Sequence, residues 1–368
     1  MKKLLSLILV LAVFACTEPN LPPEQDGDGD KTEQPNTPNT PDNPDNPNNP
    51  DNPNNPDQPG TPDVSQPEAF KRDTIIDCMV EYRTGNLPII ISAPHGSTTK
   101  GGTVEGLDLV EREKSNRKDP NCSCNFSKSQ DAYTMTLARL IDAAIYEMTG
   151  KYPYLILAKQ HRAYIDYNRH KQCAIPYVKG AYSVANEISY DKYHEIATIA
   201  STDIEKKFGA GVLLDIHGHG HAVQQVEIGY ILSKTQLTKT DEELMADEKY
   251  AKKSSIYSLS LRNKNNLSFV ELLRGEFSFG DYLKKAGLAC VPRSGKLNPA
   301  SSEDYFSGGY ISKSQGSSAE YGGTVDAIQL EFGSTVRNNE TKRAAAAKSV
   351  ATAVIDYVKK HYNTTALD

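Results

Sequence analysis

Two short apolar runs, each closely followed by a histidine, constrain the fold of this chain more than any other feature. Residues 212–216 lead directly into His217, and residues 87–93 lead into Pro94 and His95. Apolar runs of this length are typical of strands that are buried on both faces. In open α/β sheets, ligands bind at the carboxyl ends of the strands, where the loops leave the sheet. The sequence therefore predicts a composite site that contains both histidines.

The first residues of the chain have the pattern of an export signal. Residues 1–16 combine Lys2 and Lys3 with an apolar stretch and end in Ala15-Cys16, and the stretch is too short to span a membrane as a mature helix. The ending Val-Phe-Ala-Cys resembles a bacterial lipobox, which predicts cleavage before Cys16 and lipidation of its thiol. An ordinary secretory signal is the alternative. The predicted location is the bacterial cell envelope, with a lipid anchor in the outer membrane.

Residues 17–66 are predicted to be a disordered tether. Thirteen of the 21 prolines lie between Pro19 and Pro62, and no aromatic residue occurs there, so this segment cannot form a core. The tether carries eleven acidic residues against one lysine, which accounts for the net charge of −6 and leaves residues 67–368 nearly neutral. Neither nucleic-acid binding nor a basic membrane patch is indicated. The lipid anchor is the only membrane contact that we expect.

Five cysteines remain besides Cys16. Export permits disulfides, and the odd count leaves at least one free thiol. We expect structural or disulfide roles rather than a zinc site, because the chain has no CxxC pair, and the connectivity stays open. The five are Cys78, Cys122, Cys124, Cys173 and Cys290.

Residues 67–368 have the pattern of one globular α/β domain, which we expect to act as a monomer. Apolar residues at helical spacing predict a helix that starts near residues 129–131 and ends at Gly150, which places Asp131 near its N-terminus. A helix cap is the simplest role for Asp131. Further patterns predict strands at residues 154–158 and 324–333 and helices at residues 190–208 and 341–361.

A dense group of polar residues follows the strand at 154–158. Arg162, Asp166, Asn168 and Arg169 lie within eight residues and are interleaved with apolar side chains. This interleaving favours the lining of a site over a solvated loop. Ion pairs of the two arginines with Asp166 and Asp215 are the alternative explanation.

Two later segments add candidates. Glu331 ends an alternating apolar strand pattern beside Gly333, and the Gly-rich aromatic segment at residues 305–310 ends at Tyr310. Segments of the second kind suit loops that close over a pocket, so Tyr310 is a candidate substrate contact.

These residue types fit the chemistry of a catalytic zinc site. Such a site needs three protein ligands and an open position for water. His95, His217 and a carboxylate supply the ligands, Glu331 supplies a base, and Arg162 and Arg169 supply anion binders. His219 and His221 are expected to shape the loop rather than to bind the ion.

Four motifs in this order resemble the N-formylglutamate amidohydrolase-like family, which is related to zinc carboxypeptidases and to succinylglutamate desuccinylases and aspartoacylases. They are Pro94-His95-Gly96, the segment from Arg162 through Arg169, Asp215-Ile216-His217-Gly218, and Gln329-Leu330-Glu331-Phe332. The resemblance covers about residues 85–360. It implies a three-layer α/β fold with a mixed, mostly parallel sheet of about eight strands flanked by helices, as in zinc exopeptidases.

The resemblance also implies roles for single residues. His95 and His217 correspond to ligands of one Zn²⁺, and Glu331 corresponds to the base. Arg169, preceded by Asn168, would hold a substrate carboxylate, and Arg162 would stabilise an oxyanion. The third ligand departs from the pattern, because the related carboxypeptidases use His-x-x-Glu and Thr98 stands at that position here. Asp131 is the preferred replacement and Glu111 is the alternative.

The predicted function is that of an exported, lipid-anchored, zinc-dependent amidohydrolase or carboxypeptidase-like hydrolase. It would cleave an amide bond near a carboxylate, in an N-acyl amino acid or a peptide. The alternative is a surface lipoprotein that uses the same fold to bind a glycan or protein without catalysis.

Overall fold

The computed structural model describes residues 70–119, 126–362 and 365–367. The predicted export signal with Cys16, the whole predicted tether, and Cys122 and Cys124 lie outside the described residues. The description below concerns the compact unit that holds the candidate site, from Arg72 onward.

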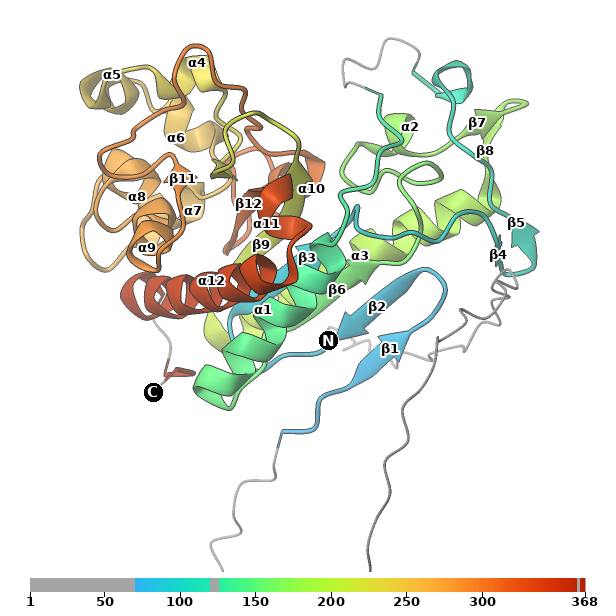
Figure 1. Cartoon of the computed structure of the whole chain (residues 1–368), viewed down its shortest axis with the longest axis horizontal. Helices are drawn as coiled ribbons and strands as arrows, with labels where there is room; N and C mark the ends of the chain where they lie inside the picture. Colours follow the sequence, from blue (N-terminus) through green and yellow to red (C-terminus); the bar gives the residue numbers. More distant parts are fainter. Residues whose placement is uncertain (1–69, 120–125, 363–364, 368) are drawn as a thin grey trace, which may run out of the picture. The chain divides into compact units, whose positions relative to one another are not determined.

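The described residues form one large sheet, two small hairpins and helices on both faces of the large sheet (Figure 1). The strands of the large sheet are β1 (Thr74–Ile76), β2 (Val80–Arg83), β3 (Ile89–Ala93), β6 (Tyr154–Ala158), β9 (Gly211–His219), β10 (Val226–Gly229), β11 (Cys290–Val291) and β12 (Val325–Gly333). The hairpins pair β4 (Thr103–Val104) with β5 (Leu107–Asp108), and β7 (Tyr177–Val178) with β8 (Ala181–Tyr182).

The longest helices are α1 (Thr134–Thr149), α3 (Val184–Phe208) and α12 (Glu340–His361). Shorter helices fill the connections, above all the long one between β10 and β12. They are η1 (Lys114–Asn116), α2 (Lys171–Ala174), α4 (Lys234–Leu237), α5 (Asp241–Ala246), α6 (Lys249–Lys253), α7 (Tyr257–Arg262), α8 (Phe269–Arg274), α9 (Phe279–Lys285), α10 (Tyr310–Ser314) and α11 (Ser334–Arg337).

The large sheet has eight strands in the order β1-β2-β6-β3-β9-β12-β10-β11. The four central strands β6, β3, β9 and β12 run parallel, and β10 and β11 are parallel to each other. Antiparallel pairs join β1 to β2, β2 to β6, and β12 to β10. The predicted fold class is confirmed: a mixed, mostly parallel sheet of eight strands between helices.

Alternate residues of the central strands pack on opposite faces of the sheet, which produces three layers. Ile89 and Ile91 of β3 belong to the core beneath α1 and α12, whereas Ile90 belongs to the core beneath α3. All five residues of β3 are therefore buried. Such burial on both faces explains why the central strands read as continuous apolar runs.

Strand β9 is longer than the sequence predicted. The apolar run suggested a strand that ends at residue 216, but β9 pairs with β12 through His219, which lies opposite Gly333. His217 and His219 are thus part of the strand rather than of a following turn. Because side chains alternate along a strand, Asp215, His217 and His219 project from the same face of the sheet.

Helix α1 ends at Gly150 as predicted, with the glycine in the left-handed conformation at φ 65°. The helix cap, the simplest explanation for an aspartate at this place, does not apply to Asp131. Tyr133 is the residue before the first helical turn, and the carboxylate of Asp131 makes no hydrogen bond to that turn. The reason is that residues 131–133 form a turn in which only the backbone carbonyl of Asp131 accepts from Thr134. The carboxylate is free for other partners.

Helix α3, predicted from residue 190, begins six residues earlier at Val184.

Two of the cysteines that the structure describes, Cys78 and Cys173, are disulfide-bonded, and Cys290 is buried with a free thiol. This distribution agrees with the predicted structural roles. Among the described residues, no helix combines the length and the apolar character that crossing a membrane requires.

Candidate metal centre

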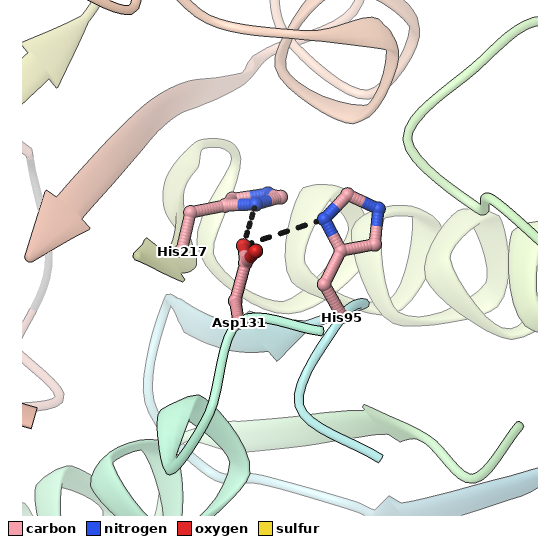
Figure 2. A group of neighbouring side chains, drawn as sticks. All are labelled: His95, Asp131 and His217. Carbon is pink, nitrogen blue, oxygen red and sulfur yellow. Dashed lines mark hydrogen bonds and ion pairs between the residues drawn. The ribbon is translucent and has the colours of Figure 1, made fainter. Parts of the chain in front are cut away.

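Three predicted ligands, His95, Asp131 and His217, meet at the carboxyl end of the central strands (Figure 2). His95 follows β3, Asp131 lies in the segment before α1, and His217 belongs to β9. Oδ2 of Asp131 lies 3.2 Å from Nδ1 of His217 and 3.4 Å from Nδ1 of His95. One ligand atom of each residue lies within 4.8 Å of the other two, and all three residues are buried. We call this group the first cluster.

The outer nitrogen of each histidine is bound to a second carboxylate. Nε2 of His95 donates to Oδ1 of Asp166 at 2.7 Å, and Nε2 of His217 donates to Oδ2 of Asp215 at 2.9 Å. A carboxylate partner fixes the proton on Nε2 and leaves the lone pair on Nδ1. When both imidazoles are neutral, both Nδ1 atoms therefore present lone pairs toward Asp131, which is the arrangement that a metal ion requires.

The polar atoms in the centre of the first cluster fit a cation. Nδ1 of His95 is buried and has no hydrogen-bond partner among the described residues. Two imidazole lone pairs and one carboxylate face each other there, and only a proton or a metal ion can make that combination favourable. The donor set, two histidines and one carboxylate, is common at catalytic zinc sites.

Asp131 is held in place by the two histidine segments. Its backbone N–H donates to the carbonyl of His95 at 3.0 Å, and its Oδ2 accepts from the backbone of Gly218 at 3.2 Å. Burial acts to raise the pKa of Asp131, but the hydrogen bond with His217 and the nearby imidazoles of His95 and His217 outweigh it and hold this pKa well below its usual range. Asp131 is thus an anion at neutral pH, as a ligand must be.

The pKa of His217 moves in the opposite direction. Burial acts to lower it, but Asp215 and Asp131 outweigh burial and raise the pKa of His217 well above its usual value. In the metal-free protein this histidine therefore keeps a proton. A metal ion at the same place would displace that proton, so metal binding and proton release are linked.

The alternative ligand Glu111 lies elsewhere. Its side chain is half exposed and forms an ion pair with Lys128 at 2.8 Å. It does not belong to the first cluster. The geometry therefore favours Asp131 as the third ligand.

Glu331 lies beside the first cluster on β12, directly opposite His217 in the strand pairing. Its side chain is buried. Oε1 accepts from Nε2 of Gln329 at 2.8 Å, whereas Oε2 has no hydrogen-bond partner among the described residues. Burial, together with Asp131 and Glu227, raises the pKa of Glu331 to about 8. A carboxylate with one unpartnered oxygen and a pKa near neutrality has the properties of a general acid or base.

Arg162 also lies at the first cluster, but it is held by carboxylates. Its Nε donates to Oδ2 of Asp166 at 3.0 Å, and its Nη1 lies 3.9 Å from Oδ1 of Asp131. The ion-pair explanation for Arg162 therefore applies in part. Its guanidinium remains adjacent to the site and offers further N–H groups there.

Arg169 is not paired with Asp215 in the described structure. Its Nη1 donates to the carbonyl of Asn168 at 2.8 Å, and its Nε is buried without a hydrogen-bond partner. A buried guanidinium nitrogen without a partner is costly unless an anion completes it. This geometry is compatible with the predicted role in binding a carboxylate.

The side chain of Asn168 is not free to contact a substrate. Its Oδ1 accepts from the backbone of Ile311 at 2.8 Å, and its Nδ2 donates to Oε1 of Gln329 at 3.2 Å. Both ends of the amide are thus engaged within the protein. Asn168 fixes the start of α10, where Tyr310 stands, and the ring of Tyr310 packs against those of His170 and His194.

Sequence reasoning assigned no site role to several residues that the structure brings here. Asp166 was expected only to line the site or to pair with an arginine, and Asp215 only to pair with an arginine. Buried Arg112, whose Nη2 lies 3.7 Å from Asp166, and Gln329, which holds Glu331, received no role. The sequence could have indicated two of them. Asp215 stands two residues before His217 and Gln329 two residues before Glu331, so each shares a face of the sheet with that candidate. No pattern indicated Arg112.

The fold and the first cluster together define an α/β protein with a candidate metal centre at the carboxyl end of its central strands. No protein-family model matches the chain, and no curated protein matches it. Solved structures do: the chain is similar to N-formylglutamate amidohydrolase from Ralstonia eutropha JMP134, with 12% identity over 77% of this chain and 98% of that one and a TM-score of 0.41.

Two further structures resemble it at lower similarity. One is a bacteriophage poly-gamma-glutamate hydrolase, with 10% identity over 76% of this chain and 89% of that one and a TM-score of 0.31. The other is an N-acetylmuramyl-L-alanine amidase from Mycobacterium abscessus, with 12% identity over 73% of this chain and 98% of that one and a TM-score of 0.29.

Proposed function

We propose that this protein is a zinc-dependent hydrolase that cleaves an amide or peptide bond next to a carboxylate. The observation that carries the proposal is the first cluster, in which two Nδ1 atoms converge on Asp131 beside the unpartnered oxygen of Glu331. The similarity to hydrolase structures is compatible with it but adds only the fold.

The ligands of the single Zn²⁺ would be His95, Asp131 and His217. When bound, the ion supplies a Lewis acid that polarises the substrate carbonyl and makes water a stronger acid. Asp166 and Asp215 keep both imidazoles in the tautomer that ligation needs. The nearby positive charge also favours the ionised form of Glu331, which is required of a base.

The remaining steps belong to the protein. Oε2 of Glu331 accepts the proton of the attacking water and returns it to the leaving amine nitrogen. Arg162, already fixed by Asp166, stabilises the negative charge that develops on the carbonyl oxygen. Arg169 holds the substrate carboxylate, with Tyr310 beside it and Asn168 as their support. The substrate class is an N-acyl amino acid or a peptide.

A binding protein on the same fold is the competing proposal, and Glu331 argues against it. A lectin or adhesin gains nothing from a buried carboxylate with an unpartnered oxygen, whereas an acid–base catalyst needs one. The test is metal analysis by mass spectrometry combined with hydrolysis assays on N-acyl amino acids and C-terminal peptides. The proposal requires bound zinc that is lost in His217→Ala, and hydrolysis that is lost in Glu331→Gln with the metal retained.

We also propose that the protein is exported and anchored to the outer membrane through a lipid on Cys16. The signal-like residues 1–16 support export, and so do the disulfide-bonded Cys78 and Cys173, because disulfides persist in oxidising compartments. Labelling of growing cells with radioactive palmitate should mark the wild-type protein and not Cys16→Ser. Equal labelling of both would refute the anchor.

A further inference from the structure

A second group of potential ligands lies next to the first cluster and has no role in the proposed reaction. It consists of His219 at the end of β9, His221 in the following turn, and Glu227 on β10. One ligand atom of each lies within 4.8 Å of the other two. His219 and Glu227 are buried, and the side chain of His221 is 18% exposed. We call this group the second cluster.

The side chains of the second cluster are oriented toward one another. Nε2 of His219 donates to the carbonyl of Gln225 at 2.8 Å, which leaves the lone pair of His219 on Nδ1. That Nδ1 lies 3.9 Å from Oε1 of Glu227, and Nδ1 of His221 lies 2.7 Å from the same oxygen. The other oxygen of Glu227 accepts from the backbone of Phe306 at 2.7 Å. Oε1 is thus aimed at both imidazoles.

The charge of Glu227 needs a cationic partner. Glu227 lies opposite Glu331 in the pairing of β10 with β12, so two buried carboxylates are neighbours. Within the part of the chain that the structure describes, no lysine or arginine forms an ion pair with Glu227; its ionic contacts are with the two histidines. A buried carboxylate with only weakly basic partners is costly, and a bound cation would remove that cost.

The hydrogen bonds within the second cluster are ones that a cation can replace. His221 Nδ1 donates its proton to Glu227, and the backbone N–H of His221 donates to Nδ1 of His219 at 3.1 Å. A metal ion would take the place of the first proton. The ion would also take the lone pair of His219 Nδ1 from the backbone N–H of His221. That N–H belongs to a turn at the surface, where water can accept from it. The exposed edge of His221 supplies the entry path.

We propose that His219, His221 and Glu227 bind a second divalent transition-metal ion, of the class that prefers mixed nitrogen and oxygen ligands, such as Zn²⁺. The two imidazoles and one carboxylate match that preference. The sheet supplies the spacing, because His217, Glu331 and Glu227 occupy paired positions on β9, β12 and β10. Glu227 lies on the far side of Glu331 from His217 in this order of strands.

The test counts metal ions. The full chain is stripped with a chelator, dialysed against Zn²⁺ or Co²⁺, and analysed for metal per chain by mass spectrometry and for the Co²⁺ absorption spectrum. We expect two ions in the wild type and one each in His221→Ala and Glu227→Gln. His217→Ala should retain the second ion. His170→Ala, an exposed histidine outside both clusters, is the matched control and should keep two.

Glu227→Gln preserves the size of the side chain and leaves an oxygen that can accept from the backbone of Phe306. His221→Ala removes a side chain that is partly exposed. At least one of the two variants should therefore fold, which circular dichroism checks. One ion in the wild type that disappears in His217→Ala would overturn the inference. A second ion that persists in both folded variants would also overturn it. If His217→Ala loses no metal while Glu227→Gln does, the inference holds and the proposed function fails.

Discussion

The two histidine clusters at the end of the sheet have similar ligands but different surroundings. In the first cluster, each histidine is backed by a buried carboxylate, Asp166 or Asp215, and Nδ1 of His95 has no hydrogen-bond partner in the described structure. In the second cluster, His219 is backed by a backbone carbonyl. A carboxylate makes the imidazole a stronger ligand than a carbonyl does. The first cluster should therefore bind metal more tightly and act in catalysis.

The largest effect should come from Glu331→Gln. The amide keeps the shape of the side chain but cannot accept a proton, so turnover should fall by about 10²–10⁴-fold with the metal content unchanged. Steady-state kinetics and metal analysis measure the two quantities. The exposed Glu320, which pairs with Lys313, provides the control Glu320→Gln. Full activity in Glu331→Gln would move the base elsewhere.

Asp131→Asn should weaken metal binding at the first cluster by at least about 100-fold, because it removes the anionic ligand. Losing a ligand should cost more affinity than losing a residue that only supports a ligand. Competition with a chromophoric chelator gives the affinity. Glu111→Gln is the matched control and should bind as the wild type does. The opposite result, with Glu111 essential and Asp131 dispensable, would reverse the assignment of the third ligand.

Asp215→Asn tests the difference between the two clusters directly. It replaces the carboxylate behind His217 with a neutral group, so the metal affinity of the first cluster should fall by about 10–100-fold. The affinity of the second cluster should not change. The same chelator titration resolves both sites, and Asp203→Asn on α3 serves as the control. An unchanged first site would show that the backing carboxylate is not what distinguishes the clusters.

Arg169→Ala should raise KM by about 10–100-fold, the equivalent of one lost charge-assisted hydrogen bond, with a smaller change in kcat. Substrates that carry a free carboxylate should show the effect, and their amide analogues should not. Arg117→Ala, which removes a guanidinium from an exposed segment, is the control. An equal loss on both kinds of substrate would contradict carboxylate binding.

The last prediction concerns stability rather than metal binding or turnover, and it tests histidines without carboxylate partners. Burial lowers the pKa of His194 from 6.5 to about 4, the reverse of the shift at His217. Between these pH values the unfolded chain binds a proton that the folded chain does not, so stability is lost as pH falls from about 6.5 to about 4. The difference of roughly 2.5 pKa units limits the loss to about 3 kcal/mol.

Urea unfolding at pH 7 and pH 4.5 measures this loss. His194→Gln should reduce the difference between the two pH values, because glutamine does not titrate. His170→Gln, on the surface, should leave the difference as it is in the wild type. If His194→Gln unfolds with the wild-type pH dependence, another buried group is responsible, and the first to examine is His361, whose pKa is also lowered to about 4.

The sequence by itself determined the elements and the strand ends at which the site is built. Buried strands have apolar runs, so β3, β6, β9 and β12 were visible within a few residues, and His95, His217 and Glu331 were placed at their ends. These are local properties, because burial on both faces and side-chain alternation are encoded over five to ten residues.

Only the tertiary structure decided which distant groups meet. Asp131 and Glu111 are both acidic residues in the connection after β3; the sequence favoured Asp131 at a helix start but left Glu111 open as the alternative. The turn before α1 leaves the Asp131 carboxylate uncommitted to the helix and in contact with His217, whereas Glu111 lies at the surface in an ion pair with Lys128. Likewise, the pairing of β10 with β12 places Glu227 beside Glu331. Such contacts depend on strand order and register, which join segments far apart in the chain.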